Sequence, residues 1–322
     1  MLGKTIDYWL FRCYRTVLSN FLSNQATILM FHRVQLGRET DFDEYTSADE
    51  FRQKMILLKR HFNVISLPSL ISLMKINKIP PFSVVVTIDD GYEDGYSIIT
   101  PILDELDIKG AFFIATEGIE KGGLWNDRII DSIMNTNTAE VRLFNQATKI
   151  NLSTVDAKLR SWKIIHDRCK FLTLNERDNA LDELESKLNT RGRRNSFLSK
   201  SQLCEMHNAG MTIGAHTHRH PILSIETNES AYMEIRKSKN TLEKIINSEV
   251  KYFAYPNGKF GRDFNNTHKT MVKELGFEAA LATDIGLVNS STDLMCLPRF
   301  TPWDKEPASF ALRLCHHLYK LK

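Results

Sequence analysis

Short apolar runs alternate with amphipathic helical patterns along most of the chain, from about residue 26 to its end. Apolar runs of this length, bounded by turn residues, are typical of strands buried in a parallel sheet. The sequence predicts seven such strands: ATILMF (26–31), FSVVVTI (82–88), GAFFIAT (110–116), MTIGAH (211–216), VKYFAY (250–255), FEAALAT (277–283) and LMCLPRF (294–300). Since the segments between them are mostly long enough for a helix, we expect an α/β fold, a parallel sheet closed into a barrel.

Two helices of this alternation carry clear start and stop signals. Ser47 with Glu50, and Ser199 with Gln202, have the spacing of capping boxes, in which each side chain accepts a hydrogen bond from the other residue's backbone. Gly210 stands where a helix beginning at Ser199 would end. These signals place helices between the predicted strands.

Residues 118–198 interrupt the rhythm, because they contain helical patterns but no convincing strand. We expect a helical insertion on one barrel loop, forming part of the rim around a site. No linker or repeat divides the chain, so residues 1–322 are interpreted as a single catalytic domain. Residues 3–23 have apolar positions at helical spacing with basic residues nearby, which predicts an N-terminal helix, either packed on the body or in peripheral contact with a membrane surface.

The composition narrows the class of protein. With 322 residues, 42% hydrophobic and 25% charged, the chain is an ordinary globular protein, and a net charge of +3 argues against nucleic-acid binding. The five cysteines are odd in number and lack a C-x-x-C spacing, which disfavours a disulfide framework or a zinc ribbon. Without an apparent export signal or a long apolar run, we expect a cytoplasmic location, at or near the inner membrane surface.

Two adjacent carboxylates, Asp89 and Asp90, follow the predicted strand 82–88 where it opens into a loop. Barrel enzymes carry their catalytic residues at such strand ends. Adjacent carboxylates repel each other, so we expect a metal ion or a strong donor beside them. Taken alone, an Asp-Gly turn that caps a helix is the alternative explanation.

Three histidines, His216, His218 and His220, follow another predicted strand within five residues. In an extended chain the Cα atoms of His216 and His220 would lie roughly 13 Å apart. We therefore expect a helical turn after the strand, which would bring both imidazoles to one ion. Thr217 stands where an H-E-x-x-H metalloprotease needs its glutamate, so that class is disfavoured.

Two histidines and one of the two carboxylates form a ligand set that suits catalytic zinc, or alternatively iron, cobalt or nickel. The carboxylate outside this set would remain available as the base. The alternative for the histidines is an ordinary surface loop without a ligand.

The motifs around these residues resemble those of the polysaccharide deacetylase family, the NodB-homology domain of carbohydrate esterase family four. Thr87–Gly91 (T-I-D-D-G) resembles its first motif, T-F-D-D-G, and His216–His220 resembles its second, H-S/T-x-x-H. Phe253–Gly258 (F-A-Y-P-N-G) is a degraded form of the third, R-x-P-Y. The likeness extends over roughly residues 26 to 300 and implies a distorted (β/α)7 barrel.

The resemblance implies that Asp89 is the general base and that one divalent metal, zinc by preference, binds Asp90, His216 and His220. Asp89 would then accept a proton from a water that the ion polarises.

The third motif implies a part of the substrate site. Tyr255 and Asn257 are expected to contact the substrate, and Asn257 stands where the family usually has tyrosine. Its backbone N–H is expected to stabilise the oxyanion that forms during hydrolysis.

Two departures from the family pattern leave roles to be filled. Ala254 replaces the arginine that pairs with the catalytic aspartate, and we expect Arg299, at the end of the last predicted strand, to take its place beside Asp89. The late L-x-H motif with its general-acid histidine is not evident, and His32, which ends the first predicted strand, is the candidate substitute.

The leading hypothesis is a metal-dependent hydrolase that removes acetyl groups from N-acetylated sugars of a polysaccharide or glycan precursor. Two alternatives stay open: an amide or imide hydrolase with a non-sugar substrate, and a carbohydrate-binding protein that has lost catalysis, which the absence of the family arginine at Ala254 would suit. Trp125 and Trp162 of the insertion either stack on sugar rings or belong to the core.

Overall fold

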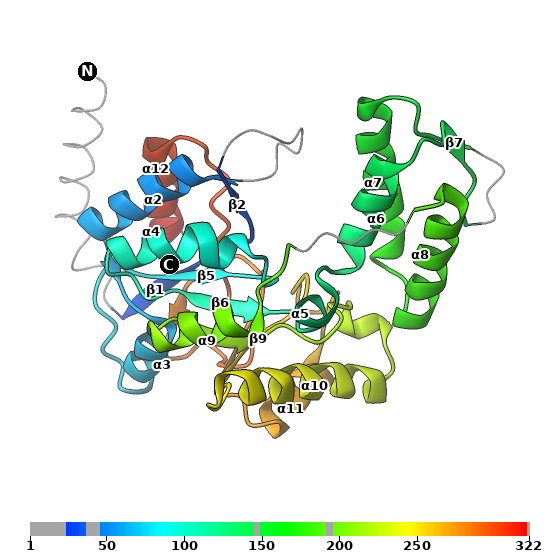
Figure 1. Ribbon diagram of the computed structural model, residues 1–322. Helices are drawn as coiled ribbons and strands as arrows, with labels where there is room; N and C mark the ends of the chain where they lie inside the picture. The colour runs from blue at the N-terminus through cyan, green and yellow to red at the C-terminus, as the bar shows by residue number, and fades with distance from the viewer. Residues whose placement is uncertain (1–23, 37–45, 145–148, 191–195, 321–322) are drawn as a thin grey trace, which may run out of the picture.

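The computed structural model describes residues 24–36, 46–144, 149–190 and 196–320 (Figure 1). The N-terminal helix predicted for residues 3–23 lies outside these residues. The described elements are β1 (Gln25–Phe31), β2 (Val34–Gln35), β3 (Thr46–Ser47), α2 (Ala48–His61), β4 (Asn63–Val64), α3 (Leu67–Lys75), β5 (Ser83–Ile88), the π-helix η1 (Gly95–Ile99), α4 (Thr100–Glu105), β6 (Ala111–Ile114), α5 (Glu117–Lys121), α6 (Trp125–Asn135), β7 (Glu140–Val141), β8 (Ile150–Asn151), α7 (Val155–Cys169), α8 (Leu174–Leu188), α9 (Lys200–Asn208), β9 (Thr212–Ala215), the 3₁₀ helix η2 (Leu223–Ile225), α10 (Asn228–Ile246), β10 (Tyr252–Ala254), α11 (Asn266–Glu274), β11 (Ala279–Leu281), β12 (Val288–Asn289) and α12 (Pro307–Lys320).

Among the described residues, an eight-stranded curled sheet lies at the centre of the protein, and six of its parallel strands follow one another in the order β11-β10-β9-β6-β5-β1. They are the first six strands that the sequence predicts. β5 pairs with β1 over its whole length, with β4 at its start, and with β6 from Thr87 onward. β12 adds an antiparallel pair at the start of β1. The fold is therefore the α/β barrel type that the sequence predicts, in a distorted form.

The seventh predicted strand, LMCLPRF (294–300), is not a regular strand. This segment lies between β11 and β1 and pairs with them in isolated bridges, Leu297 with Leu281 and Phe300 with Leu29. Pro298 has no N–H to donate to a ladder, which explains why regular pairing does not continue through it. The segment closes the barrel with a few backbone hydrogen bonds.

The alternation of side chains along each strand separates two cores. On β5, Val85 points into the barrel, where it packs with residues of β1, β6, β10, β11 and α3. Val84 and Val86 point outward and join a larger cluster covered by helices such as α2, α10 and α12. Because both faces are covered, the parallel strands carry apolar residues at nearly every position.

The predicted capping signals are confirmed. Ser47 with Glu50 and Ser199 with Gln202 form reciprocal capping boxes at the starts of α2 and α9. After α9, Gly210 adopts a left-handed φ of +86°, a conformation that favours glycine.

Helices fill most of the region between β6 and β9, where α6, α7 and α8 pack around a third apolar cluster. The small antiparallel pair β7–β8, which the sequence pattern did not predict, joins α6 to α7. Figure 1 shows these helices beside the barrel, on the side toward which β6 points. Helices α6, α7 and α8 with the β7–β8 pair are called the insertion below. The insertion thus stands at the carboxyl end of the strands. Among the described residues no helix is long and apolar enough to cross a membrane.

Candidate metal centre and active site

The chain turns sharply where β5 ends, and this turn separates the two adjacent carboxylates. Asp90 has a left-handed φ of +77° and Gly91 follows with +102°. Aspartate tolerates this region better than most residues, whereas a Cβ at Gly91 would lie 2.8 Å from the Ile114 side chain. The turn lets Asp89 and Asp90 meet different partners.

Asp89 is held by Arg299 in a buried, two-pronged ion pair. The two terminal nitrogens of Arg299 donate to Oδ1 and Oδ2 of Asp89, each at 2.8 Å, while its Nε donates to the carbonyl of Ala282. Asp89 is 2% exposed and Arg299 1%. Burial by itself would raise the pKa of Asp89, but the guanidinium and its hydrogen bonds outweigh this effect and lower the pKa to about 2.

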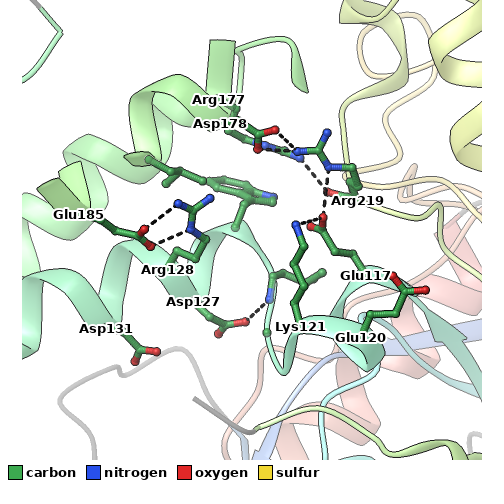
Figure 2. A pocket seen from close by; sticks show the side chains of 14 residues that line it. Glu117, Glu120, Lys121, Asp127, Arg128, Asp131, Arg177, Asp178, Glu185 and Arg219 are labelled. Atoms are coloured by element: carbon green, nitrogen blue, oxygen red, sulfur yellow. Dashed lines mark hydrogen bonds and ion pairs between the residues drawn. The ribbon is translucent and has the colours of Figure 1, made fainter. Parts of the chain in front are cut away.

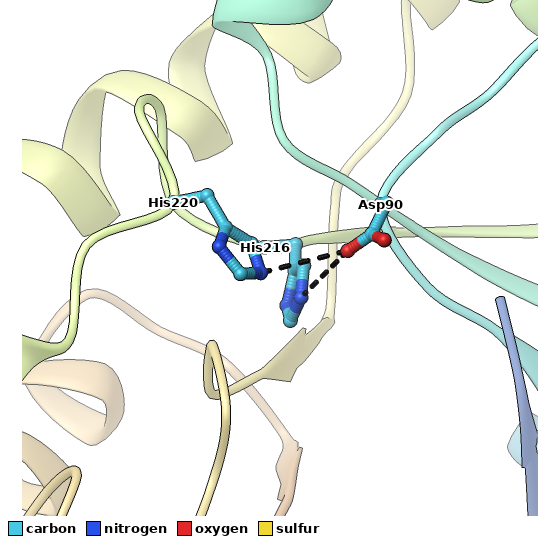
Figure 3. Close-up of side chains that lie close together, drawn as sticks. All are labelled: Asp90, His216 and His220. Carbon is cyan, nitrogen blue, oxygen red and sulfur yellow. Dashed lines mark ion pairs between the residues drawn. The ribbon is translucent and has the colours of Figure 1, made fainter. Parts of the chain in front are cut away.

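Asp90 faces the two histidines instead (Figure 3). Its Oδ1 lies 3.6 Å from Nε2 of His216 and 3.5 Å from Nε2 of His220. One ligand atom from each of the three residues lies within 4.8 Å of the other two. Their side chains thus converge on one point from the ends of β5 and β9.

The donor set fits a divalent metal ion. Nδ1 of His216 lies 2.7 Å from the carbonyl of Ala254, an interaction that makes Nδ1 the protonated nitrogen and leaves the lone pair of Nε2 directed toward Asp90. Burial lowers the pKa of His216 and His220, so both imidazoles are neutral near pH 7, the form that binds metals. Three protein ligands leave positions open, as in catalytic zinc sites.

The predicted helical turn between the two histidines is wrong in its form. The chain makes a tight bend after β9, with left-handed φ values of +63° at Thr217 and +53° at His220. The hydroxyl of Thr217 accepts a hydrogen bond from the N–H of His220 at 3.1 Å and fixes the bend. A side chain that replaces a backbone acceptor brings the imidazoles together without a helix.

The degraded third motif divides into a core residue and a cavity residue. The ring of Tyr255 stacks on Phe264 with centroids 3.7 Å apart, and its hydroxyl donates to the carbonyl of Met295. Tyr255 therefore packs inside the protein and does not line the cavity described below, although its motif leads us to expect contact with the substrate. Asn257, with a left-handed φ of +58°, lines the cavity, and its N–H donates to no other group in the part of the chain that the structure describes.

A cavity of about 440 Å³ contains these groups. His32, the candidate general acid, is exposed and lines it together with Asp89, Asp90, His216 and His220. The predicted site residues therefore line one cavity, with two exceptions. Arg299 is buried and contacts Asp89, and Tyr255 is buried in the core. The other residues of the lining are Met30, Leu124, Trp125, Asn126, His166, Asn257, Lys259, Thr283, Ile285, Phe300, Thr301, Trp303 and Arg313.

Sequence reasoning missed several residues of this lining. The insertion contributes Asn126 and His166, and the ring of His166 stacks on Trp125 at 5.0 Å. Neither residue stands in a motif, because only the packing of the insertion brings it to the cavity. Trp303, which is 77% exposed, stands at the cavity too. The one available signal in the sequence was a tryptophan shortly after the last predicted strand.

Comparison with known proteins agrees with this geometry. The sequence model of the polysaccharide deacetylase family matches residues 77–280, more than half of the chain. This match includes the turn after β5, the bend after β9 and the loop after β10. No curated protein matches the chain.

Several solved structures share the fold. The deacetylase PplD from Streptococcus pyogenes, in complex with acetate, has a TM-score of 0.62 and 18% identity, covering 90% of this chain and 98% of that chain. IcaB from Ammonifex degensii has a TM-score of 0.58 and 16% identity, with 90% and 97% covered. A de-N-acetylase from Aggregatibacter actinomycetemcomitans has 0.56 and 16%, with 86% and 94% covered.

The family match, on a barrel whose strand ends gather two carboxylates and two histidines, identifies the chain as a member of the polysaccharide deacetylase family, enzymes that hydrolyse N-acetyl amide bonds.

Proposed function

We propose that the protein is a metal-dependent deacetylase that removes acetyl groups from N-acetylated sugars of a polysaccharide or glycan precursor. Asp90, His216 and His220 hold one divalent ion, for which zinc is our choice because imidazole and carboxylate ligands with open positions suit it. When bound, such an ion polarises a carbonyl and lowers the pKa of water. The other residues of the cavity supply proton transfer and orientation.

Asp89 accepts the proton of the attacking water in this proposal. Arg299 occupies one direction on each of its oxygens, and each carboxylate oxygen has a further lone pair for a second hydrogen bond. The guanidinium keeps Asp89 ionised although it is buried. Besides its two hydrogen bonds to Asp89, Arg299 donates one to the Thr87 hydroxyl and one to the Ala282 carbonyl. The ion pair is therefore rigid before substrate arrives.

Two groups act on the other side of the amide. The N–H of Asn257 stabilises the oxyanion in this proposal. A hydrogen bond from the Thr283 hydroxyl to the Asn257 carbonyl at 2.6 Å supports this role, because it restrains the backbone of Asn257. His32 delivers a proton to the leaving amine, which is a poor leaving group while unprotonated. Its exposure lets it exchange that proton with solvent afterwards.

The lining supports a sugar as the substrate. Hydroxyl and amide side chains of Asn126, Thr283 and Thr301 line the cavity that holds the metal ligands, and the exposed indole of Trp303 offers a flat apolar surface for the face of a pyranose ring. This mixture suits a ligand with many hydroxyl groups better than an apolar amide.

The observation that carries the proposal is that the two adjacent carboxylates have different partners. Asp89 binds Arg299, whereas Asp90 faces His216 and His220. The test is to remove metal with a chelator, restore zinc, cobalt, nickel or iron singly, and measure acetate release from N-acetylated oligosaccharides and from small amides and imides. Metal-dependent acetate release from the oligosaccharides is expected. Cleavage of small amides alone would favour the non-sugar alternative, and saccharide binding without acetate release would indicate an inactive binding protein.

A further inference from the structure

The bend that carries His216 and His220, residues 216–220 and called the metal loop below, is gripped from two sides. On the barrel side, Oε2 of Glu234 in α10 accepts hydrogen bonds from the N–H groups of His218 and Arg219, at 3.1 Å and 2.6 Å. On the insertion side, Arg177 in α8 donates to the carbonyl of Arg219 at 2.8 Å and to that of His220 at 3.3 Å. One residue of the insertion thus touches the backbone of a metal ligand.

Arg177 is built into this position. It is 2% exposed, and its guanidinium lies 4.8 Å from the centre of the Trp125 ring at the start of α6. Burial lowers the pKa of Arg177 to about 10, so it stays charged at neutral pH. A buried charge requires partners, and the terminal nitrogens of Arg177 donate to two carbonyls of the metal loop.

The side chain of Arg219 ties the same loop to the insertion a second time. Figure 2 shows Arg219 between Asp178, which follows Arg177 in α8, and Glu117 of α5. It hydrogen-bonds to Asp178, and its Nε lies 3.3 Å from Glu117. Glu117 also pairs with Lys121 at 2.7 Å. These ion pairs hold α8 beside the metal loop. They therefore also restrain the position of Arg177 relative to the carbonyls it contacts.

The metal loop has a conformation that needs such support. Thr217 and His220 both have left-handed φ values, and neither is glycine. The Thr217 hydroxyl supports the bend from within, and strained conformations of this kind persist where surrounding contacts also hold them. Glu234 restrains the N–H groups in the middle of the loop, whereas Arg177 restrains the carbonyl of the ligand residue itself.

We propose that Arg177 is a positioning residue of the metal centre: the insertion holds His220 in ligating geometry through it. This inference rests on the metal site proposed above and extends it to a residue outside the barrel motifs. It also gives the insertion a role beyond shaping the cavity, because its packing sets metal affinity.

The test compares zinc binding by the wild-type protein with that by Arg177→Met, Arg177→Lys and a control, Arg128→Met. Arg128 lies in the insertion and, like Arg177, lines a second, charged cavity beside the metal loop (Figure 2). Its hydrogen bonds go to Glu185 and Asp182 rather than to the metal loop. Affinity is measured by competition with a chelator, and ligand geometry by the visible absorption of the cobalt-substituted protein. Thermal unfolding of the metal-free proteins reports on folding.

We expect Arg177→Met to weaken zinc binding by roughly 10- to 100-fold, the usual scale for losing a group that orients a ligand, and to change the cobalt spectrum. Arg177→Lys should recover part of the affinity, since an ammonium lacks the planar fork that reaches two carbonyls. Arg128→Met should bind zinc as the wild type does.

Unchanged zinc affinity and an unchanged cobalt spectrum in Arg177→Met would overturn the inference while leaving the proposed function intact. Loss of folding in both Arg177 variants would assign the residue to stability and contradict a positioning role. A wild-type protein that binds no zinc, cobalt, nickel or iron would remove the proposed metal site itself, and the inference with it.

Discussion

The strand ends of the barrel and the charged cavity of the insertion both gather ionisable side chains, but they pair them differently. The insertion cavity, of about 470 Å³, is lined by ten charged residues, most of which bind one another, as Arg128 does with Glu185. At the strand ends, Asp90 has two imidazoles near it, at separations longer than a good hydrogen bond. Most of the insertion charges are paired with one another, whereas Asp90 and the two imidazoles converge on a point between them.

This difference separates scaffolding from chemistry. Paired charges hold α8 and α5 against the barrel and leave little capacity for a ligand. Carboxylate and imidazole groups that converge without contact retain that capacity, which is why the barrel groups bind metal in our account. The following predictions test this contrast, from the largest expected effect to the smallest.

Replacing both histidines, His216→Ala with His220→Ala, should abolish stoichiometric zinc binding and acetate release together. Two of the three ligands are lost, and a single carboxylate does not hold zinc tightly. Metal analysis after gel filtration measures the first effect. Retention of one equivalent of zinc by the double variant would move the metal site elsewhere.

Asp89→Asn should keep its zinc and fold but lower turnover by roughly 10² to 10⁴, the scale for losing a general base. An amide has the size of the carboxylate but accepts no proton at neutral pH. Acetate release at saturating substrate is the measurement. Turnover within a few-fold of wild type would show that another group is the base.

Arg299→Lys should move the acidic limb of the pH–rate profile to higher pH. Arg299 lowers the pKa of Asp89, and Asp89 must be ionised to act, so activity is present above that pKa and is lost as the pH falls through it. Lysine cannot make the same pair of hydrogen bonds to Asp89, so it offsets the effect of burial less completely than arginine does. We expect the pKa of Asp89 to rise by about 1 to 3. The profile of kcat/KM reports the free enzyme. An acidic limb at its wild-type position would separate Arg299 from the ionisation of Asp89.

Tyr255→Phe should leave kcat and KM unchanged and lower the free energy of unfolding by about 1 kcal/mol, the net worth of one hydrogen bond. Its hydroxyl bonds the Met295 carbonyl in the core rather than facing the cavity. Denaturant unfolding and steady-state kinetics measure the two effects. A large rise in KM with unchanged stability would restore Tyr255 to the substrate site.

Much of the barrel and of the metal centre could be predicted from the sequence, because both depend on local patterns. The apolar runs predicted six strands correctly. A motif that directly follows a parallel strand must lie at the barrel mouth, as Asp89, Asp90 and His216 do. Arg299 could be predicted as a partner only because a missing arginine at Ala254 left a buried carboxylate without a counter-charge.

What the sequence could not predict depends on contacts between distant segments. Pro298 lacks the N–H that regular pairing of the closing segment would need, and a hydrogen bond to the Thr217 hydroxyl takes the place of a helical turn. Hydrophobic periodicity registers neither effect. Tyr255 was misplaced because the motif fixes a loop position but not the direction of its side chain. Arg177 reaches the metal loop across more than forty residues of sequence, and its own segment looks like an ordinary helix.

The central claim is that neighbouring carboxylates have separate roles, Asp90 as metal ligand and Asp89 as ionised base. Zinc titration of Asp89→Asn and Asp90→Asn in parallel tests it most directly, since the two variants differ only in which adjacent carboxylate is lost. The account predicts that Asp89→Asn binds one equivalent of zinc with nearly wild-type affinity and that Asp90→Asn does not. Tight zinc binding by Asp90→Asn together with its loss in Asp89→Asn would contradict the account and exchange the two roles.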